Sequence, residues 1–459
     1  MSKEISNLKH AAAIIKDRKE KIGEVIVLNT GSVITSEATA MLQALHSRSV
    51  GGLKEHLKNL AKSGSDKFMS SFYVGYGHKS IGDCGSTVIF IEGVSMLNAK
   101  AIQDWKLYSG QEASTRYIDF KEQPFLNPLK TKKVEKVLED WRKFYIYAMP
   151  RVVESLKDRF PISAGEKDGI YTKAIDARAF DILRGFLPAG ATTNLAWSTN
   201  LRQAADKIAL LRHHPLLEVS ATAESLADVL KMAHPSSFGH NVYAETEEYN
   251  DNWMSNNYYY HNKNSPNFKL KRNSIDIKQL KEYKNILKSR PNAHTELPPH
   301  IAELGDLQFE FTLDFGSFRD IQRHRAVTQR MPLLTTDLGF EDWYLDELPK
   351  DIKVKAKKLL EKQEKAIKSF NTSSEIAQYY IAMGYKCANR LTGDLKALVY
   401  LVELRNTRFV HPTLRRRAIQ LAKVLEDKFS KYGLEIFLDK EPDMFDVKRG
   451  EHDIVNKDK

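Results

Sequence analysis

The tripeptide Arg323-His324-Arg325 places two guanidinium groups on either side of an imidazole. It follows an alternating apolar run from Leu307 to Phe315, so these donors lie where a strand is expected to pass into a helix. Arginine presents a planar fork of N–H donors that fits a phosphate or a carbonyl edge bidentately. The tripeptide therefore indicates an anion-binding site, although a solvated basic helix face would have the same composition.

A second set of polar residues, in the first half of the chain, has the chemistry that would complement such a site. It offers hydroxyl, carboxylate, amide and guanidinium groups, which together suit a nucleotide monophosphate and a second phosphate-bearing ligand. Its members are His78, Ser80, Glu112, Ser114, Arg116, Arg184, Asn200, Arg202 and Arg212. Taken singly, these residues have structural explanations as helix surface, helix cap or salt-bridge partners, so the set is informative only as a whole.

The size and charge of the chain limit the classes of protein to which it can belong. Its 459 residues are enough for two or three domains, and a 42% hydrophobic content is typical of globular proteins. A formal charge of +11 favours anionic partners, which include nucleotides, phosphorylated cofactors, nucleic acids and membrane surfaces. Charge alone does not distinguish among these partners.

Cysteine content and hydropathy point to a soluble protein of a reducing compartment. Cys84 and Cys387 lie far apart, which excludes a disulfide framework and a structural zinc site. The N-terminus is charged, and no apolar run approaches the length that spans a bilayer. We therefore expect a cytoplasmic protein with no metal and no membrane partner.

The hydrophobic periodicity predicts a similar order of elements in each half of the chain. In the first half it predicts a strand over 86–94 and helices over 133–160, 174–187 and 204–232. In the second half it predicts a strand over 307–315 and helices over 352–370, 375–388 and 395–431. Between the halves lies a stretch rich in Asn, Tyr and Lys, with a predicted helix near 277–287.

The repeated order indicates two related domains in tandem. We predict an α+β fold in which each domain is a small antiparallel sheet with a helical half. The first domain is expected over 1–238, a polar connecting segment over 239–298 and the second domain over 299–459. The two domains are expected to pack face to face, as related subunits do.

Together these motifs resemble those of the flavin-dependent thymidylate synthase family. The family's GHxS pattern is matched by Gly77–Ser80, with Asp83 where the family prefers glutamate, and its ExSxRY pattern by Glu112–Tyr117. Counting eight residues back from Ser114 gives the family's RHR position, where this chain has Asp104-Trp105-Lys106. The carboxylate of Asp104 stands in place of a guanidinium, so the RHR motif of the first repeat is broken.

The second repeat departs from the family in the opposite way. It keeps Arg319 and the complete Arg323-His324-Arg325, but no SxRY pattern follows, and the NxR position reads Asp394-Leu395-Lys396. In the family, the RHR of one subunit meets the other motifs of a neighbouring subunit around one flavin and one dUMP. The resemblance thus implies one composite site, made from the RHR of the second repeat and the motifs of the first.

The resemblance implies that dUMP is methylated with methylenetetrahydrofolate as carbon donor, while FAD carries the hydride and NADPH reduces the FAD. It assigns Arg323, His324 and Arg325 to the flavin and to catalysis, and His78, Ser80, Asn200 and Arg202 to FAD binding. The residues assigned to substrate binding are Glu112, Ser114, Arg116, Arg184, Arg212 and Arg319. Because the family is tetrameric, a tandem chain is expected to form a homodimer that acts as a pseudo-tetramer.

Two other functions are compatible with the sequence. The complementary defects would also suit an inactive relative that binds a nucleotide or flavin without turnover. The basic runs Arg415-Arg416-Arg417 and Lys353–Lys358 would suit a nucleic-acid-binding protein. Nucleic acid is the less favoured partner, because such runs on amphipathic helices usually form solvated faces.

Overall fold

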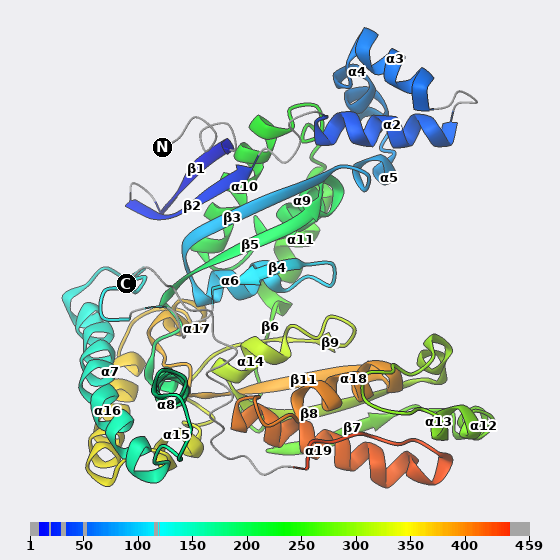
Figure 1. Cartoon of the computed structure of the whole chain (residues 1–459). Coiled ribbons are helices and arrows are strands. Elements are labelled where there is room, and N and C mark those ends of the chain that lie inside the picture. Colours follow the sequence, from blue (N-terminus) through cyan, green and yellow to red (C-terminus); the bar gives the residue numbers. More distant parts are fainter. Residues whose placement is uncertain are drawn as a thin grey trace. The chain divides into compact units, whose positions relative to one another are not determined.

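The computed structural model describes residues 9–17, 20–28, 34–48, 53–113, 118 and 120–440. These residues form two compact units, each with its own antiparallel sheet and helices (Figure 1). The first unit draws on residues 1–118, 123–126 and 191–258, and the second on residues 119–122, 127–190 and 259–459. The predicted α+β class with small antiparallel sheets is confirmed. Within the described residues, no helix is long and apolar enough to cross a membrane.

The first unit is built on a five-stranded antiparallel sheet with the strand order β1-β2-β3-β5-β4. The strands are β1 (Lys9–Asp17), β2 (Glu20–Leu28), β3 (Ser86–Ser95), β4 (Ser109–Glu112) and β5 (Thr192–Asn200). Its helices are α2 (Ser36–Arg48), α3 (Leu53–Ser63), α4 (Asp66–Phe68), the π-helix η1 (Met69–Gly75), α5 (Lys79–Gly82), α6 (Met96–Gln103), α9 (Leu201–Leu211), α10 (Leu217–Ala233) and α11 (Ala244–Asn257). The helix α10 packs across β1 and β2 and so covers one part of the sheet.

The second unit contains a four-stranded antiparallel sheet with the order β7-β8-β11-β9. Its strands are β7 (Phe268–Asn273), β8 (Asp306–Asp314), β9 (Thr328–Gln329) and β11 (Lys386–Asp394), and the short β6 (Tyr259–Tyr260) pairs in parallel with β10 (Met331–Pro332). Its longer helices are α7 (Lys132–Arg159), α8 (Asp168–Leu183), α16 (Lys350–Lys368), α18 (Leu395–Arg405) and α19 (Pro412–Phe429). Shorter helical segments are η3 (Arg184–Phe186), α12 (Ile277–Glu282), α13 (Lys284–Lys288), η4 (Pro299–Leu304), α14 (Phe315–Ile321), α15 (Asp342–Asp346), α17 (Ser374–Ala377), η5 (Gln378–Tyr380) and η6 (Ser430–Tyr432).

The order of elements repeats along the chain. In the first half β3 leads into α6, and β5 leads into α9 and α10; in the second half β8 leads into α14, and β11 leads into α18 and α19. The helices that follow these strands begin with capping side chains at equivalent places, Ser95 and Asp314 in one pair and Asn200 and Asp394 in the other. Each cap accepts a hydrogen bond from a backbone N–H of the first helical turn, which fixes where the strand ends and the helix begins.

The helices α7 and α8 come from the first repeat, but they belong to the compact unit that holds the second repeat. The side chains of α16 explain this arrangement for α7. Gln363 Nε2 donates to the backbone oxygen of Val137 at 2.8 Å, and Lys362 Nζ contacts Asp140 Oδ2 at 2.6 Å. Residues far apart in sequence therefore build one core.

Two equivalent segments, 184–190 and 378–384, lie antiparallel within the second unit. Counting from the caps, residue n of the first repeat corresponds to n + 194 (394 − 200), so Pro188 corresponds to Ala382, with which it forms a β-bridge. The flanking backbone bonds run from Ala189 to Ile381, from Met383 to Leu187, from Gly190 to Tyr379 and from Gly384 to Gly185. The four bonds form two equivalent pairs: replacing each residue of one bond by its counterpart in the other repeat gives the second bond of the pair. This is the pattern that a local twofold axis produces.

Three of the predicted helices are wrong in extent. The predicted helix over 204–232 is two helices. Helix α9 ends at Leu211, Pro215 lies in the connection, and α10 begins at Leu217. The predicted helix over 395–431 is likewise divided, with Pro412 at the start of α19. The helix expected over 375–388 ends in η5, and its last residues form β11, whose partners in β8 are far away in sequence.

The polar stretch over 239–298 contains more regular structure than its periodicity indicates. It contributes α11 and the strand β7, which extends the second sheet by pairing with β8. The helix predicted near 277–287 is present as α12 followed by α13. Only Phe268 and Leu270 of β7 are partly buried, so the apolar alternation of this strand covers just its first four residues.

The pairing of segments 184–190 and 378–384 brings backbone so close to neighbouring atoms at Gly384 that no side chain fits there. A Cβ atom on Gly384 would lie 2.5 Å from the Phe340 ring and 2.8 Å from the Gly185 backbone oxygen. We expect Gly384→Ala to lower the free energy of unfolding by about 1–3 kcal/mol, measured by urea denaturation. The matched control is Gly169→Ala in α8, where a Cβ meets nothing within 4 Å and should stabilise by about 0.5–1 kcal/mol. Equal effects at both glycines would contradict a steric requirement at the pairing.

Candidate functional site

The candidate site in the second unit is built on the helix α14. Asp314 ends β8, and its Oδ2 accepts a hydrogen bond from Ser317 N at 2.9 Å, which starts the helix. The helix then presents Arg319 and Asp320 in its last turn and ends at Ile321. Arg323-His324-Arg325 follows directly, so the strand-to-helix transition predicted from the sequence is present.

Asp320 lies at the centre of a cluster of guanidinium groups. Its carboxylate is 3.9 Å from Arg184 Nη1 and 3.5 Å from Arg323 Nη2, and its backbone oxygen accepts from Arg405 Nη2 at 3.0 Å. Burial would raise the pKa of Asp320, but Arg323, Arg184, Arg405 and Arg319 together hold it below its usual value. Asp181 and Asp314 also act on Arg184, so four guanidinium groups face three carboxylates, and the small positive surplus favours an anionic ligand.

His324 is fixed as a neutral hydrogen-bond acceptor. Its side chain is buried, with the ring edge against Tyr400, and Arg405 Nε donates to its Nε2 at 2.7 Å. Burial, with Arg405 as the next cause, lowers the pKa of His324 to about 3. The imidazole is therefore uncharged at neutral pH, and Arg405 determines its orientation.

The two arginines of the tripeptide are exposed, unlike the histidine between them. The Arg323 side chain is 54% exposed and makes its ion pair with Asp320. For Arg325, no ion pair or hydrogen bond of the guanidinium is recorded within the described part of the chain. Both side chains are thus accessible to a ligand, as anion binding requires.

Two predicted substrate-binding residues, one from each repeat, meet in this cluster. Arg184 comes from the first repeat and Arg319 from the second, and both are buried next to Asp320. Arg184 Nη2 also contacts Ser317 Oγ at 3.4 Å. The pairing of segments 184–190 and 378–384 brings Arg184 to this position, so the two repeats share one charged cluster.

The residues predicted to bind FAD gather in the first unit. His78 precedes α5, which contains Ser80, and both are exposed. Asn200 caps α9, and Asp83 Oδ1 accepts hydrogen bonds from Asn200 Nδ2 at 3.1 Å and from Arg202 Nε at 2.7 Å. Asp83, at the family's acidic position, therefore orders the amide and the guanidinium beside α5.

The other predicted substrate residues have different surroundings. The Glu112 side chain is only 2% exposed, because its carboxylate binds Lys100 Nζ at 2.8 Å. Arg212 is exposed and pairs with Glu247 at 3.3 Å. Ser114 and Arg116 lie outside the described residues.

The broken RHR position is occupied by an internal charge pair that the sequence analysis did not identify. Asp104 lies nine residues after the cap Ser95, as Arg323 lies nine after Asp314, which confirms the correspondence of the two positions. Lys207 Nζ donates to the Asp104 backbone oxygen at 2.9 Å. Burial raises the pKa of Asp104 and lowers that of Lys207 to about 8.

Sequence reasoning missed Asp320, which supports the tripeptide, and the lysine that faces Asp104; Arg405 stands at the L-R position that the second repeat keeps, but its contact with His324 was not foreseen. Asp320 stands three residues before Arg323, a spacing that predicts an ion pair on one helix face. Lys207 lies on the buried face of α9 with Ala204 and Leu211, a place that is unusual for a lysine. No local signal predicts the contact of Arg405 with His324, because it joins residues 81 positions apart.

The described residues contain no group of three or more His, Cys, Asp or Glu side chains that could hold a metal ion. The recognisable site chemistry consists of guanidinium, ammonium, amide and hydroxyl groups. These groups bind anions and polar heterocycles.

Comparisons with known proteins agree with the motifs. The chain is similar to a UPF0159 protein of Chlamydia muridarum, with 26% identity over 76% of each chain. It is also similar to a UPF0159 protein of Chlamydia pneumoniae (25%, again 76% of each chain) and to one of Thermoplasma acidophilum (24%, 78% of this chain and 85% of the relative). Their names do not specify a reaction.

Residues 29–236 match the family described as thymidylate synthase complementing protein. This segment holds the GHxS, ExSxRY and NxR motifs that carry the resemblance found in the sequence. The match supports a function related to thymidylate synthesis, in a family that is in general flavin-dependent. Over this segment, which is less than half of the chain, the sequence is similar to the thymidylate synthase complementing protein family.

Proposed function

We propose that the protein methylates dUMP to dTMP with methylenetetrahydrofolate, FAD and NADPH, at one composite site between the two repeats. The observation that supports this most is the cluster around Asp320. Arg184 of the first repeat and Arg319 of the second lie there together, beside the complete RHR tripeptide. A site formed by both repeats has the composition that the family builds from separate subunits.

The residues present fit an anionic nucleotide cofactor. Arg323 and Arg325 are exposed guanidinium groups in a cluster with surplus positive charge, and Ser80 and Arg202 are accessible donors in the first unit. These groups would hold the phosphates and the polar ring edge of FAD. When bound, FAD would supply the hydride chemistry that amino-acid side chains lack.

The protein's own contribution would be binding and orientation. Arg323 and Arg325 would stabilise negative charge at the cofactor and substrate. His324 would offer a neutral ring held still by Arg405, and Asp320 would keep the guanidinium groups apart and oriented. Arg116 and Ser114 are proposed for the dUMP phosphate and Arg212 for the uracil edge.

The reciprocal site is proposed to be inactive. At the position of Arg323 the first repeat has Asp104, which interacts with Lys207 instead of a ligand. The second repeat has Asp394 and Lys396 where the first has Asn200 and Arg202, and Lys396 is bound by Glu296. Each chain would therefore have one working site, and a homodimer in the cytoplasm would have two working sites.

The first test is catalytic. Arg325→Ala should lower dUMP-dependent NADPH oxidation about 100-fold or more, because an exposed guanidinium that stabilises developing charge would be lost. Arg151→Ala, which removes an exposed arginine from α7, is the matched control and should leave the rate unchanged.

A flavin absorbance band in the purified protein should accompany this activity. A protein that shows no such band and no response to added FAD would exclude the proposed cofactor. A protein that binds flavin and dUMP but does not oxidise NADPH would instead be the inactive relative.

The second test addresses the reciprocal site. Asp104→Arg restores the family residue in the first repeat, yet it should not raise the rate of dTMP formation. Its facing motifs are absent from the second repeat, and the new charge would lie beside Lys207. A rate clearly above that of the unsubstituted protein would refute the assignment of a single site.

The third test uses the pKa of His324. Because the folded value of about 3 is below the ordinary 6.5, the unfolded chain takes up a proton that the folded protein excludes between these pH values. Acidification below pH 6.5 should therefore destabilise the fold, and His324→Gln should reduce this sensitivity. The imidazole NMR signal of His324 should not titrate between pH 5 and 8, and a midpoint near 6.5 would contradict the buried neutral ring.

A further inference from the structure

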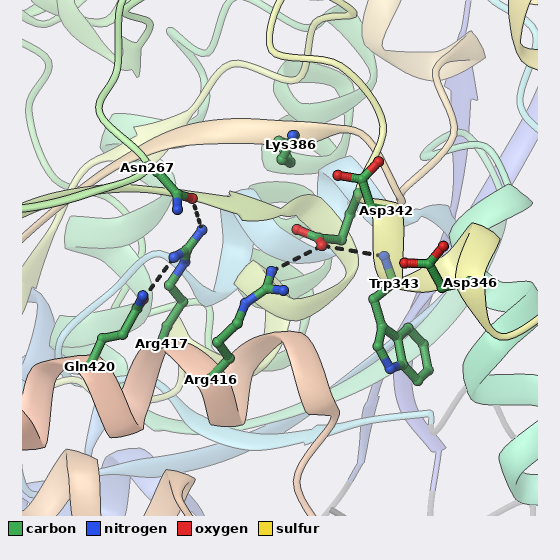
Figure 2. Close-up of a pocket in the computed structure, with 9 residues that line it drawn as sticks. Asn267, Asp342, Trp343, Asp346, Lys386, Arg416, Arg417 and Gln420 are labelled. Atoms are coloured by element: carbon green, nitrogen blue, oxygen red, sulfur yellow. Dashed lines mark hydrogen bonds and ion pairs between the residues drawn. The ribbon is translucent and has the colours of Figure 1, made fainter.

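A separate cavity in the second unit lies between α15, α19 and the start of β11, and its volume is about 290 Å³. Figure 2 shows Arg416 and Arg417 projecting from α19 toward it, with Lys386, Asp342 and Asp346 around it. None of these five residues belongs to the cluster around Asp320 or to any of the family motifs. The cavity therefore needs its own explanation.

Arg417 is a buried cation that forms no ion pair within the described residues, although the charges of Glu341 and Asp314 act on it. Its residue is 1% exposed, and its guanidinium donates to Thr312 O at 2.8 Å, Gln420 Oε1 at 2.7 Å and Asn267 Oδ1 at 2.6 Å, which are all neutral acceptors. Burial, and next the neighbouring Arg416, lowers its pKa to about 10. A charge removed from water in this way is costly unless an opposite charge comes near.

The other charged side chains at the cavity are Arg416, Lys386 and the carboxylates of Glu341, Asp342 and Asp346. Arg416 Nη2 pairs with Glu341 Oε1 at 2.9 Å, and Glu341 is buried. Lys386 has no recorded ion pair through its ammonium group within the described residues. The lining therefore holds three cations and three carboxylates, of which Arg416 and Glu341 neutralise each other.

The remaining carboxylates lie at the rim. Asp342 and Asp346 are exposed, and Asp346 Oδ1 is bound by Lys353 Nζ at 2.8 Å. Water screens their charges more than that of the buried Arg417 or of the partly buried Lys386. They would discourage large anions from the surface while leaving the inner cations open to a small one.

The cationic wall is specific to the second repeat. The start of α19 at Pro412 corresponds to the start of α10 at Leu217, so Arg416 and Arg417 correspond to Ala221 and Thr222 (416 − 195 and 417 − 195). Lys386 at the start of β11 likewise corresponds to Thr192 at the start of β5. The first repeat therefore has no counterpart of this wall, and the site is not an inherited half of the composite site.

We infer that this cavity is a second ligand site, which binds a small oxyanion with two negative charges, such as a phosphate group or a dicarboxylate. Arg417 and Lys386 are the two cations of the lining for which no ion pair is found within the described residues, and they set the charge of the ligand. Arg416 and Lys386 have N–H groups to donate to the oxyanion, while Arg417 supplies charge from behind them. The site is distinct from the arginines proposed to hold flavin and dUMP.

The test measures binding of inorganic phosphate and of succinate to the full chain by calorimetry, in chloride at constant ionic strength. Saturable binding of one anion per chain is expected. Lys386→Gln and Arg416→Gln should each weaken it about tenfold or more, since each removes a charge-assisted contact. Lys362→Gln, an exposed lysine of α16, is the matched control and should not change the affinity.

The Arg325→Ala variant separates this site from the one proposed for dUMP, since it should retain the binding. Binding of phosphate but not succinate would identify a phosphate-bearing ligand, and the reverse a dicarboxylate; either result supports the inference. It is overturned if neither anion binds saturably, if Lys386→Gln and Arg416→Gln bind as tightly as the unsubstituted protein, or if only Arg325→Ala loses binding. Circular dichroism of each variant confirms that it is folded.

Discussion

The pairing of segments 184–190 and 378–384 is the constraint on which the second unit depends. Each segment belongs to a different repeat, and Pro188 lies opposite its own equivalent, Ala382. Backbone hydrogen bonds on both sides leave little freedom in register, because a shift would unpair buried N–H and C=O groups. The pairing thereby holds Arg184 beside Asp320. The position of the charged cluster is therefore set by hydrogen bonds between backbone groups.

The same twofold relation shows how the two repeats have diverged. The equivalent of Arg184 is Gln378, which is fully buried and accepts a hydrogen bond from Leu334 N at 3.0 Å. A guanidinium in that place would need an anion or a carboxylate, whereas the amide is satisfied by backbone. The backbone has therefore kept its symmetry while the charge has become concentrated around Asp320, on one side only.

Motif spacing and strand positions could be predicted from the sequence because both depend on local order. β3 and β8 match their predicted ranges to within a residue, and the Asp104 position corresponds to Arg323 as counted. The partners that compensate charge were not predictable in this way. Lys207 reaches Asp104, and Arg405 reaches His324, across long stretches of chain, and apolar periodicity carries no information on such contacts.

Buried charge also explains why the two repeats can differ so much without losing their fold. A guanidinium out of water costs several kcal/mol unless its surroundings compensate it. Around Asp320 a carboxylate provides part of that compensation, and in the first repeat Lys207 lies beside Asp104. Within the described residues the guanidinium of Arg417 donates hydrogen bonds only to neutral acceptors, and Glu341 and Asp314 offset its charge in part without pairing with it. A bound oxyanion would supply the negative charge that balances Arg417. Ligand binding therefore explains why an arginine is buried at this position.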